Sequence, residues 1–542
     1  MFFNKEKIKE YFKRDFKADL IAGIVVGLVA LPLSIAFAIA SGVSAEQGLY
    51  TAIIAGGIMA ILAGSNYQVS GPTGAFIVIL LGIVNKFGVD GLLMAGFMAG
   101  IILILMGVFK FGSIIKFIPY PVTVGFTSGI AVIIFSGQIK NFLGLDFAGK
   151  RPLDFMETIE MIWESLARGV NKYALLVGVV TLIVFVLWKR YNKKFPPAPV
   201  ALLGGIIMSL FFMDKMPIVG DIPRGLPSFK MLHFDFETMK ILLPSAFTVA
   251  MLGAIESLLS AVVADGMTGT KHDSNKELVA QGMGNVIVPF FGGIPATGAI
   301  ARTATNIKNG AKTKMAAIIH AIVLLCIILV FAQYAKYIPL SALAAILITV
   351  AYNMSEIDHF KKLMKAPRRD VIVLLITFLL TVFADLTVAV GVGVVMAALL
   401  FIKRASDIQI VSLDDNVKVG SEGSRRLHAS LSDYPQISLY EISGPMFFGA
   451  ASMMQERMGY EQNGVLIIRM KHVGAIDATA MHALEILIDE VHAVGGKLIL
   501  ATVQPYVLNN LQKNGIIDQL GGDKFVANSS TEAIEIAKQM IK

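Results

Sequence analysis

The sequence predicts a polytopic α-helical membrane protein that carries a small α/β domain at its C-terminal end. With 55% hydrophobic and 16% charged residues among 542, and a mean hydropathy of +0.70, the chain is too apolar for a soluble globular protein. Apolar segments of about 20 residues alternate with charged loops, as membrane-spanning helices require. After Arg404 the composition changes to that of a soluble domain. These three observations set the fold class.

Fourteen apolar segments are expected, two of which are too short to span a bilayer alone. Pro32 interrupts the first segment, which is tolerated where the freed backbone groups find partners or line a cavity. The short segments follow the turns Ser-Gly-Pro-Thr-Gly-Ala and Ile-Pro-Ala-Thr-Gly-Ala and resemble the halves of broken helices. The predicted segments are residues 19–40, 48–63, 70–84, 91–109, 122–138, 173–188, 197–213, 245–264, 281–293, 294–310, 315–333, 339–352, 370–383 and 386–402.

The basic residues define a topology rather than a nucleic-acid-binding surface. Although the net charge is +8, Lys and Arg gather at the ends of the apolar segments, in alternate loops. This distribution favours an even number of spans in the cytoplasmic (inner) membrane, with both termini in the cytoplasm. The loops assigned to the cytoplasm contain Lys110, Lys116, Lys189, Arg190, Lys193, Lys194, Lys308, Lys312, Lys314, Lys361, Lys362, Lys365, Arg368, Arg369, Lys403 and Arg404.

An internal repeat relates the two halves of the membrane region. A shift of 224 residues places Thr73-Gly74-Ala75 on Thr297-Gly298-Ala299 and lays residues 30–42 over residues 254–266. Seven segments in each half make the second copy start from the opposite side, so the repeats are inverted. Paired broken helices in two inverted halves indicate a transporter binding site. Chance matching of small residues in apolar sequence is the alternative.

Glu256 is a lone carboxylate inside an apolar segment, where it needs a partner or a function. Close to a positive site, it could alternate between protonated and ionised states, which makes it the candidate ion-coupling group. Ser260 lies one turn further along the same face and could supply a hydroxyl to it. The alternative is a structural carboxylate that accepts hydrogen bonds from unwound backbone.

The C-terminal region alternates strand-like and helix-like runs, as small α/β domains do. We expect a membrane domain over residues 1–405, a polar linker over 406–426 and the α/β domain over 427–542. Strands are predicted at residues 437–443, 464–471 and 497–503, and helices near 451–458 and at 478–494, 505–514 and 531–541.

Taken together, these motifs resemble the SulP/SLC26 family of anion transporters over essentially the whole chain. The resemblance rests on Pro32 with the following Gly48-Leu49-Tyr50, on the two Thr-Gly-Ala turns, on Gly-Ala-Ile-Glu-Ser-Leu-Leu around Glu256, and on Arg-Thr-Ala-Thr-Asn-Ile-Lys-Asn-Gly. Ile476-Asp477-Ala478-Thr479-Ala480 resembles the helix start of a STAS domain. The family implies seven-plus-seven inverted repeats with core and gate domains, elevator-like transport, and a homodimer with cytoplasmic STAS domains.

The resemblance also implies that the anion lies between the two facing helix starts. Backbone N–H groups there bind an anion without a full positive charge, so the anion can leave again. Arg302 adds positive field, unless it only snorkels at a helix end. The implied substrate-binding residues are Ser34, Phe37, Thr73, Gly74, Ala75, Gly298, Ala299 and Arg302.

The coupling ion and the substrate are less well defined by the sequence. Members that resemble sodium-driven bicarbonate transporters tend to have Asp where this chain has Glu256 and a hydroxyl residue where it has Ile300. The missing oxygen ligand favours H⁺ over Na⁺ as the coupling cation. Many sulfate-type members have Gln at the position of Leu33, so sulfate, bicarbonate and C4-dicarboxylates all remain candidates. The alternatives to proton coupling are a sodium-coupled bicarbonate symporter and an uncoupled exchanger or channel.

The remaining candidates concern packing and regulation. His320 in an apolar run is either a packing histidine or part of a proton relay. Thr479 takes the place of the phosphorylatable hydroxyl of soluble STAS regulators, or caps the helix together with Asp477. A membrane-anchored regulator acting through the STAS domain is a further reading, and this domain could bind a cytoplasmic partner. A nucleobase transporter would share the fold without these motifs. We expect no enzyme activity, cofactor, metal site or nucleic-acid partner.

Overall fold

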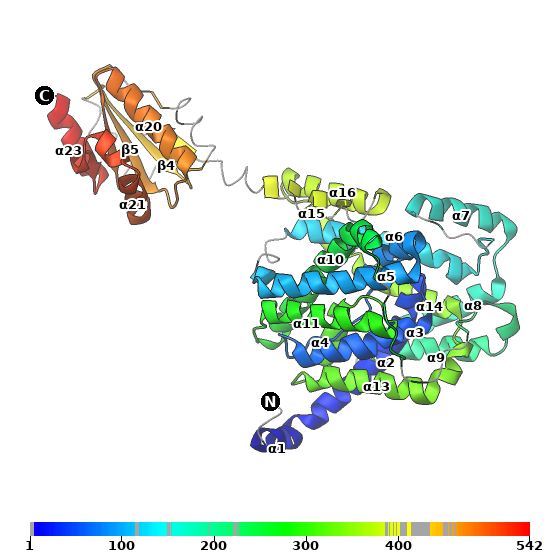
Figure 1. Cartoon of the computed structure of the whole chain (residues 1–542). Coiled ribbons are helices and arrows are strands. Elements are labelled where there is room, and N and C mark those ends of the chain that lie inside the picture. The colour runs from blue at the N-terminus through cyan, green and yellow to red at the C-terminus, as the bar shows by residue number, and fades with distance from the viewer. Residues whose placement is uncertain are drawn as a thin grey trace. The chain divides into compact units, whose positions relative to one another are not determined.

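The computed structural model divides the chain into two compact units, Met1–Val395 and Met396–Lys542 (Figure 1). The structure describes residues 5–113, 119–148, 152, 154–192, 195–220, 225, 227–232, 234–384, 388–389, 391–393, 395–396, 398–400, 409–412, 434–447, 454, 458–459 and 462–541.

Thirteen of the fourteen predicted segments coincide with a helix or part of one in the membrane unit, and the last, residues 386–402, lies partly outside the described residues. Eight helices among the described residues are long and apolar enough to cross a membrane, and Pro197–Ser209 is a shorter apolar helix. The first half contains α1 (Lys5–Arg14), α2 (Phe16–Ala40), α3 (Ala45–Tyr50), α4 (Gly56–Leu62), α5 (Ile77–Val108), α6 (Tyr120–Leu143), α7 (Phe155–Arg168), α8 (Lys172–Tyr191) and α9 (Pro197–Ser209). The second half contains α10 (Phe236–Thr268), α11 (Ser274–Ile287), α12 (Ile300–Lys308), α13 (Met315–Phe331), α14 (Leu340–Met354), α15 (Ile357–Leu363) and α16 (Arg368–Phe383).

Two helices of the membrane unit contain an internal proline. The expected interruption at Pro32 is wrong, because α2 runs through it without a break, and α10 likewise runs through Pro244. A proline inside a helix removes one backbone donor, which neighbouring helices can compensate in a membrane protein. The real break lies in α5 at Gly88, whose φ of 69° is accessible to glycine without strain. It separates the two segments that the sequence placed at residues 70–84 and 91–109.

The helices of the membrane unit pack in two groups. In the first, α11 packs on α5 and α4, α13 packs on α2 and α4, and α10 packs on α5 and α12. Figure 1 shows α5, α11, α4 and α13 lying side by side. In the second group, α6 packs on α14 and α16, and α8 packs on α9 and α14. These groups are the core and the gate of the predicted fold class, and each draws helices from both halves of the sequence.

The second unit is an α/β domain built on a five-stranded sheet in the order β3-β4-β5-β6-β7. The strands β4 to β7 are parallel, β3 pairs antiparallel with β4, and Leu466–Ile468 and Leu498–Leu500 lie buried in its core. Its elements are β3 (Gln409–Ser412), β4 (Ile437–Ser443), β5 (Val465–His472), α20 (Ala478–Ala493), β6 (Lys497–Ala501), α21 (Pro505–Lys513), α22 (Ile516–Leu520), β7 (Val526–Ala527) and α23 (Ser530–Ile541).

The sequence underestimated how much of the chain this domain uses. The strand β3 lies inside the stretch expected to be a linker and forms one edge of the sheet. Four residues with a single polar-apolar alternation give too little signal to be recognised as a strand. Most of the helix expected near residues 451–458 lies outside the described residues. The other predicted strands and helices are present.

Candidate anion-binding site

Two very short strands bring the two halves of the membrane unit together. Residues Ser70–Gly71 form β1 and Thr297–Gly298 form β2, and they pair antiparallel, with Ser70 opposite Gly298 and Gly71 opposite Thr297. A helical stretch beginning with a 3-10 turn at Gly74 and continuing as α5 follows β1, and α12 follows β2. Thr73–Ala75 and Thr297–Ala299, matched by the sequence repeat, therefore sit at two helix starts that leave one small sheet.

The backbone donors at the second helix start are not the expected ones. The N–H of Gly298 donates to Ser257 Oγ at 3.0 Å, and the N–H of Ala299 donates to the carbonyl of Val69 at 2.9 Å. Because both donors are already used, the expectation that they bind an anion needs correction. The first bond of α12 runs from Thr303 N to Ala299 O at 2.9 Å, so the N–H groups of residues 300–302 precede any intrahelical acceptor.

Arg302 is buried, with 1% of its surface exposed, and it connects the two helix starts. Its Nη2 donates to the carbonyl of Pro72, just before the first helix start, while its Nη1 is buried without a hydrogen-bond partner. Gly71 has a φ of 155°, and a Cβ there would lie 2.6 Å from Arg302 Nη1. The glycine is needed for the guanidinium to come this close. Snorkelling to the membrane surface does not fit such burial.

Glu256 lies beside the first helix start. Its Oε2 accepts a hydrogen bond from Thr73 Oγ1 at 3.2 Å, and the residue is half-buried. Ser260, the expected hydroxyl partner, is engaged elsewhere, because its Oγ donates to Thr303 Oγ1 at 3.1 Å. Thr73, from the other half of the sequence, takes the position that was assigned to Ser260.

Of the two α2 residues assigned to the pocket wall, Phe37 lies beside the first helix start. Ser34 Oγ is buried without a hydrogen-bond partner. A Cβ on Gly74 would lie 3.4 Å from Phe37 Cε1, 3.7 Å from Ile134 Cδ1 and 3.0 Å from Met354 Sδ. The approach to the first helix start is therefore closed by α2 together with α6 and α14 of the gate. Neither Ile134 nor Met354 carries a sequence signal, since both look like ordinary apolar helix residues.

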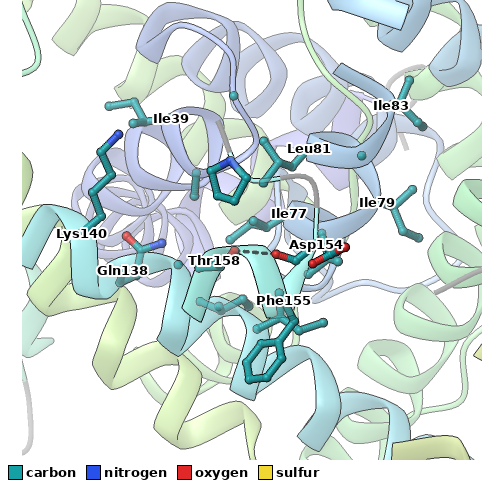
Figure 2. Close-up of a pocket in the computed structure, with 18 of the residues that line it drawn as sticks. Ile39, Ile77, Ile79, Leu81, Ile83, Gln138, Lys140, Asp154, Phe155 and Thr158 are labelled. Atoms are coloured by element: carbon teal, nitrogen blue, oxygen red, sulfur yellow. Dashed lines mark hydrogen bonds between the residues drawn. The ribbon is translucent and has the colours of Figure 1, made fainter. Parts of the chain in front are cut away.

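A cavity of about 690 Å³ lies between core and gate on the other side of Ile134 (Figure 2). Figure 2 shows Ile77 of α5, Gln138 of α6 and Thr158 of α7 around it. Lys86 and Lys140 also line it, and so do the C-terminal ends of α2, α6 and α16. In the predicted topology these ends face the outside.

His320 is buried on α13, with its ring next to Gly56 of α4. A Cβ on Gly56 would also lie 2.9 Å from the carbonyl of Ser70 in β1, so His320 packs close to the small sheet. The sequence reasoning also missed Ser257, whose Oγ bonds Thr297 Oγ1 at 2.7 Å, and three polar residues of α11. Their four-residue spacing, at Glu277, Gln281 and Asn285, was the available signal, because it places them on one helix face.

In the second unit, Asp477 is the N-cap of α20, and its Oδ1 accepts a hydrogen bond from Ala480 N at 2.8 Å. Thr479 is the second residue of the helix and is exposed, so the capping role belongs to Asp477 alone. This part of the prediction for Thr479 was wrong.

Replacing Asp477 with alanine is expected to destabilise the start of α20 by about 1 kcal/mol, because one backbone donor loses its acceptor. Faster amide hydrogen exchange of residues 478–481 in the full-length chain would measure this. Thr479→Ala is the matched control. It should change the opening free energy measured by exchange by less than about 0.5 kcal/mol, because substitutions of exposed residues usually have small effects. Equal effects of the two changes would contradict the assignment of the cap.

The fold, with a core and with a gate that closes over the first helix start, is that of a membrane transporter. The chain belongs to the sulfate permease family, whose profile matches residues 16–377, and a STAS domain profile matches residues 428–532. Members of this family are transporters and not enzymes.

Three comparisons illustrate the relationship. The Bacillus subtilis (strain 168) protein "Putative sulfate transporter YvdB" is 43% identical over 497 residues, covering 90% of this chain and 92% of its own. "Bicarbonate transporter BicA" of a Picosynechococcus species is 32% identical over 474 residues, covering 84% and 83%. The solved structure of murine Solute Carrier 26 family member A9, an anion transporter in its inward-facing state, superposes with a TM-score of 0.86 at 18% identity, covering 97% of this chain and 92% of that one.

Proposed function

We propose that this protein is a secondary active transporter of a small inorganic anion, of the sulfate or bicarbonate class, driven by protons through an elevator-like movement. The observation that carries the proposal is the buried Arg302 Nη1, a donor without an acceptor, at a place where two helix starts meet. Buried donors without acceptors are costly, and a bound anion would satisfy them. The relatives named for sulfate and for bicarbonate transport support this substrate class.

The binding chemistry suits reversible capture. The N–H groups of Gly74 and Ala75 on one side and of residues 300–302 on the other carry the partial positive charge of helix N-termini. Arg302 contributes one full charge, and Glu256 offsets part of it when ionised. An anion held by partial charges and one shared cation is bound firmly enough to be selected and weakly enough to be released.

Alternating access follows from the two helix groups. Ile134 and Met354 of the gate close over Gly74 of the core, and Ile134 also lines the 690 Å³ cavity. Sliding of the core against these two side chains would open the helix starts to that cavity. Lys86 and Lys140 in its lining would attract anions toward it.

Glu256 is the proposed coupling group. When ionised it neutralises the Arg302 region and weakens anion binding; when protonated it leaves the positive field intact. Anion and proton would then bind together, which is symport. The hydrogen bond from Thr73 also fits a structural carboxylate, and this reading corresponds to an uncoupled exchanger.

The orientation and assembly of the protein are part of the same proposal. Both termini would lie in the cytoplasm of a cell whose inner membrane contains the transporter, with the STAS unit on that side. We further propose that the chain works as a homodimer.

Uptake by reconstituted proteoliposomes tests the function. Radiolabelled sulfate, bicarbonate, fumarate and chloride would be offered with an inward proton gradient, an inward sodium gradient or neither. We expect sulfate or bicarbonate to accumulate only with the proton gradient. Accumulation with the sodium gradient alone would identify a sodium symporter. Equilibration of the anion to the same level under all three conditions would identify an uncoupled exchanger or channel. If no anion were taken up at all, the proposal would be contradicted.

Cysteine modification tests the access path. Gly137 lines the cavity and has open space for a side chain, so Gly137→Cys in a Cys326→Ser background should fold and transport normally. A membrane-impermeant thiol reagent added outside intact cells should abolish its uptake. Gly266, near the end of α10 on the predicted cytoplasmic side, also has open space, and Gly266→Cys is the control. Inhibition of Gly266→Cys but not Gly137→Cys would reverse the topology.

A further inference from the structure

The helix α11 carries a row of polar side chains that lies outside the proposed binding site. Glu277, Gln281 and Asn285 are four residues apart, so they share one helix face, and all three are buried. Their hydrogen bonds lead to both short strands rather than to other parts of α11 alone. We propose that this polar row is a positioning device that fixes the two helix starts at the separation the anion requires. The inference rests on the proposed function of the site.

Glu277 anchors the segment before β1. Its Oε2 accepts from the N–H groups of Gly64 at 2.8 Å and Ser65 at 3.0 Å, and its Oε1 accepts from Gln68 Nε2 at 2.8 Å and Gln281 Nε2 at 2.9 Å. Four donors saturate one buried carboxylate, which makes the arrangement rigid.

Gln281 joins this anchor to β1. Its Nε2 donates to Glu277 Oε1 and also to Ser70 Oγ at 2.8 Å. Ser70 is opposite Gly298 in the two-stranded sheet and lies four residues before Gly74, where the first helix begins. A shift of Gln281 would therefore displace the strand that leads into the first helix start.

Asn285 holds the second strand in the same way. Its Nδ2 donates to the carbonyl of Ala296 at 2.8 Å, and its Oδ1 accepts from Ala296 N at 2.7 Å. Ala296 immediately precedes β2, which leads into α12. Side chains on one face of α11 thus bond Ser70 of β1 and the residue before β2, in addition to the bonds between the strands themselves.

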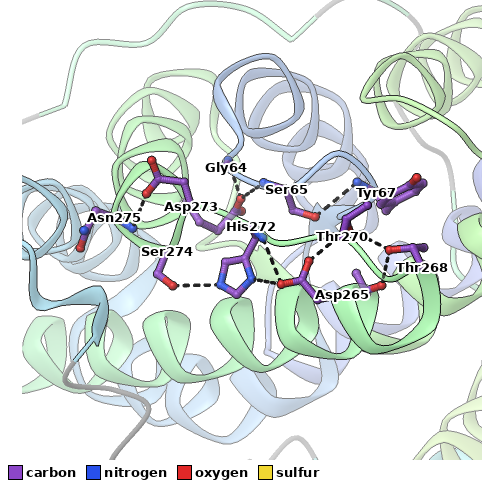
Figure 3. A network of polar contacts seen from close by, with 12 residues as sticks. Gly64, Ser65, Tyr67, Asp265, Thr268, Thr270, His272, Asp273, Ser274 and Asn275 are labelled. Atoms are coloured by element: carbon purple, nitrogen blue, oxygen red, sulfur yellow. Dashed lines mark hydrogen bonds and ion pairs between the residues drawn. The ribbon is translucent and has the colours of Figure 1, made fainter.

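The start of α11 is itself held in place, which it must be if α11 is to position the two strands. The side chain of Asp273 caps it by accepting from Asn275 N and Lys276 N, at 3.0 and 3.1 Å. His272 bonds Asp265 of α10 at 2.7 Å and Ser274 at 3.0 Å, and Figure 3 shows this chain of contacts near Gly64 and Ser65. The row therefore starts from an end that is tied to α10.

The central test replaces Gln281 with methionine, which keeps the length of the side chain and removes its donors. In proteoliposomes the KM for the transported anion is expected to rise about tenfold, because small displacements of binding groups have effects of this order or larger. The maximal rate per folded transporter should stay within about twofold, since the groups that bind and move the anion are still present. Lys276→Met on the same helix is exposed and serves as the control, with unchanged KM.

A second variant separates positioning from general damage to the fold. Ser70→Ala removes the acceptor at the other end of the same hydrogen bond, and it should raise KM by a similar factor. The double variant should be no worse than Gln281→Met alone, because Gln281→Met already removes the bond to Ser70 together with the one to Glu277. Multiplied effects in the double variant, or a fall in maximal rate with unchanged KM, would overturn the proposal.

Amide hydrogen exchange supplies a readout independent of transport. In Gln281→Met, the amides of residues 70, 71, 73–76 and 297–302 should exchange at least about tenfold faster than in the parent protein, while α13 stays protected. Unchanged exchange at these amides would refute positioning even if no anion were transported. Faster exchange with unchanged KM would show that the row holds the strands without setting affinity. Absence of transport by the parent protein would instead refute the proposed function.

Discussion

Replacing Arg302 with glutamine is expected to raise the KM for the transported anion by about 30-fold or more. The buried guanidinium contributes a charge-assisted hydrogen bond through its unpartnered Nη1, and such bonds contribute about 2–3 kcal/mol, which corresponds to about 30- to 150-fold in affinity. Initial rates of labelled uptake at several anion concentrations measure the change. The KM of Arg302→Lys should lie between that of the parent protein and that of Arg302→Gln. Lysine keeps the positive charge but lacks the forked guanidinium that also contacts the Pro72 carbonyl.

Lys308→Gln is the matched control for this prediction. Lys308 is in the last turn of the same helix and is exposed, so removing its charge takes the same +1 from α12 without touching the helix start. Thermal unfolding would be followed for each variant to confirm that it is folded. A KM for folded Arg302→Gln equal to that of the parent would exclude the guanidinium from anion binding.

Glu256→Gln is expected to abolish proton-driven accumulation while leaving exchange of anion for anion intact. An inward gradient of one pH unit supplies ~1.4 kcal/mol per proton, enough for about tenfold accumulation in a one-to-one symport. A neutral amide mimics the protonated carboxyl and cannot release a proton, so the variant should equilibrate the anion without concentrating it. Uptake with and without the gradient, and counterflow from preloaded vesicles, measure both quantities.

The control for this second prediction is Glu237→Gln, at the exposed start of the same helix α10. It should still accumulate the anion about tenfold under the same gradient. Retained accumulation in Glu256→Gln would identify Glu256 as a structural carboxylate held by Thr73, and the coupling group would have to lie elsewhere.

The architecture could be predicted from the sequence because membrane burial leaves a strong compositional trace. A span needs about 20 apolar residues, so the segments and their approximate limits could be identified directly. The twin Thr-Gly-Ala turns indicated where the two halves meet, and β1 and β2 pair there. In contrast, Pro32 led to a wrong prediction of a break, because a membrane helix can contain proline without breaking. The break that does occur is at Gly88 in α5.

The details of the site depended on contacts between distant residues, which no local pattern encodes. Ser257 and Val69 use the N–H groups of Gly298 and Ala299, so the available donors move one step into α12. The partner of Glu256 could not be predicted either, because Thr73, which takes the place assigned to Ser260, lies 183 residues away in the sequence. The row on α11 was detectable as three polar residues on one face, but its purpose emerges only from the strands it contacts.

The central claim is that one anion binds between the two helix starts, and cryo-electron microscopy of the full-length chain with a saturating transported anion tests it most directly. The account predicts density within hydrogen-bonding distance of Arg302 Nη1 and Ser34 Oγ, close to the N–H groups of Gly74 and Ile300, which disappears without the anion. Density only near Lys86 and Lys140 in the cavity, with the helix starts unchanged, would contradict it.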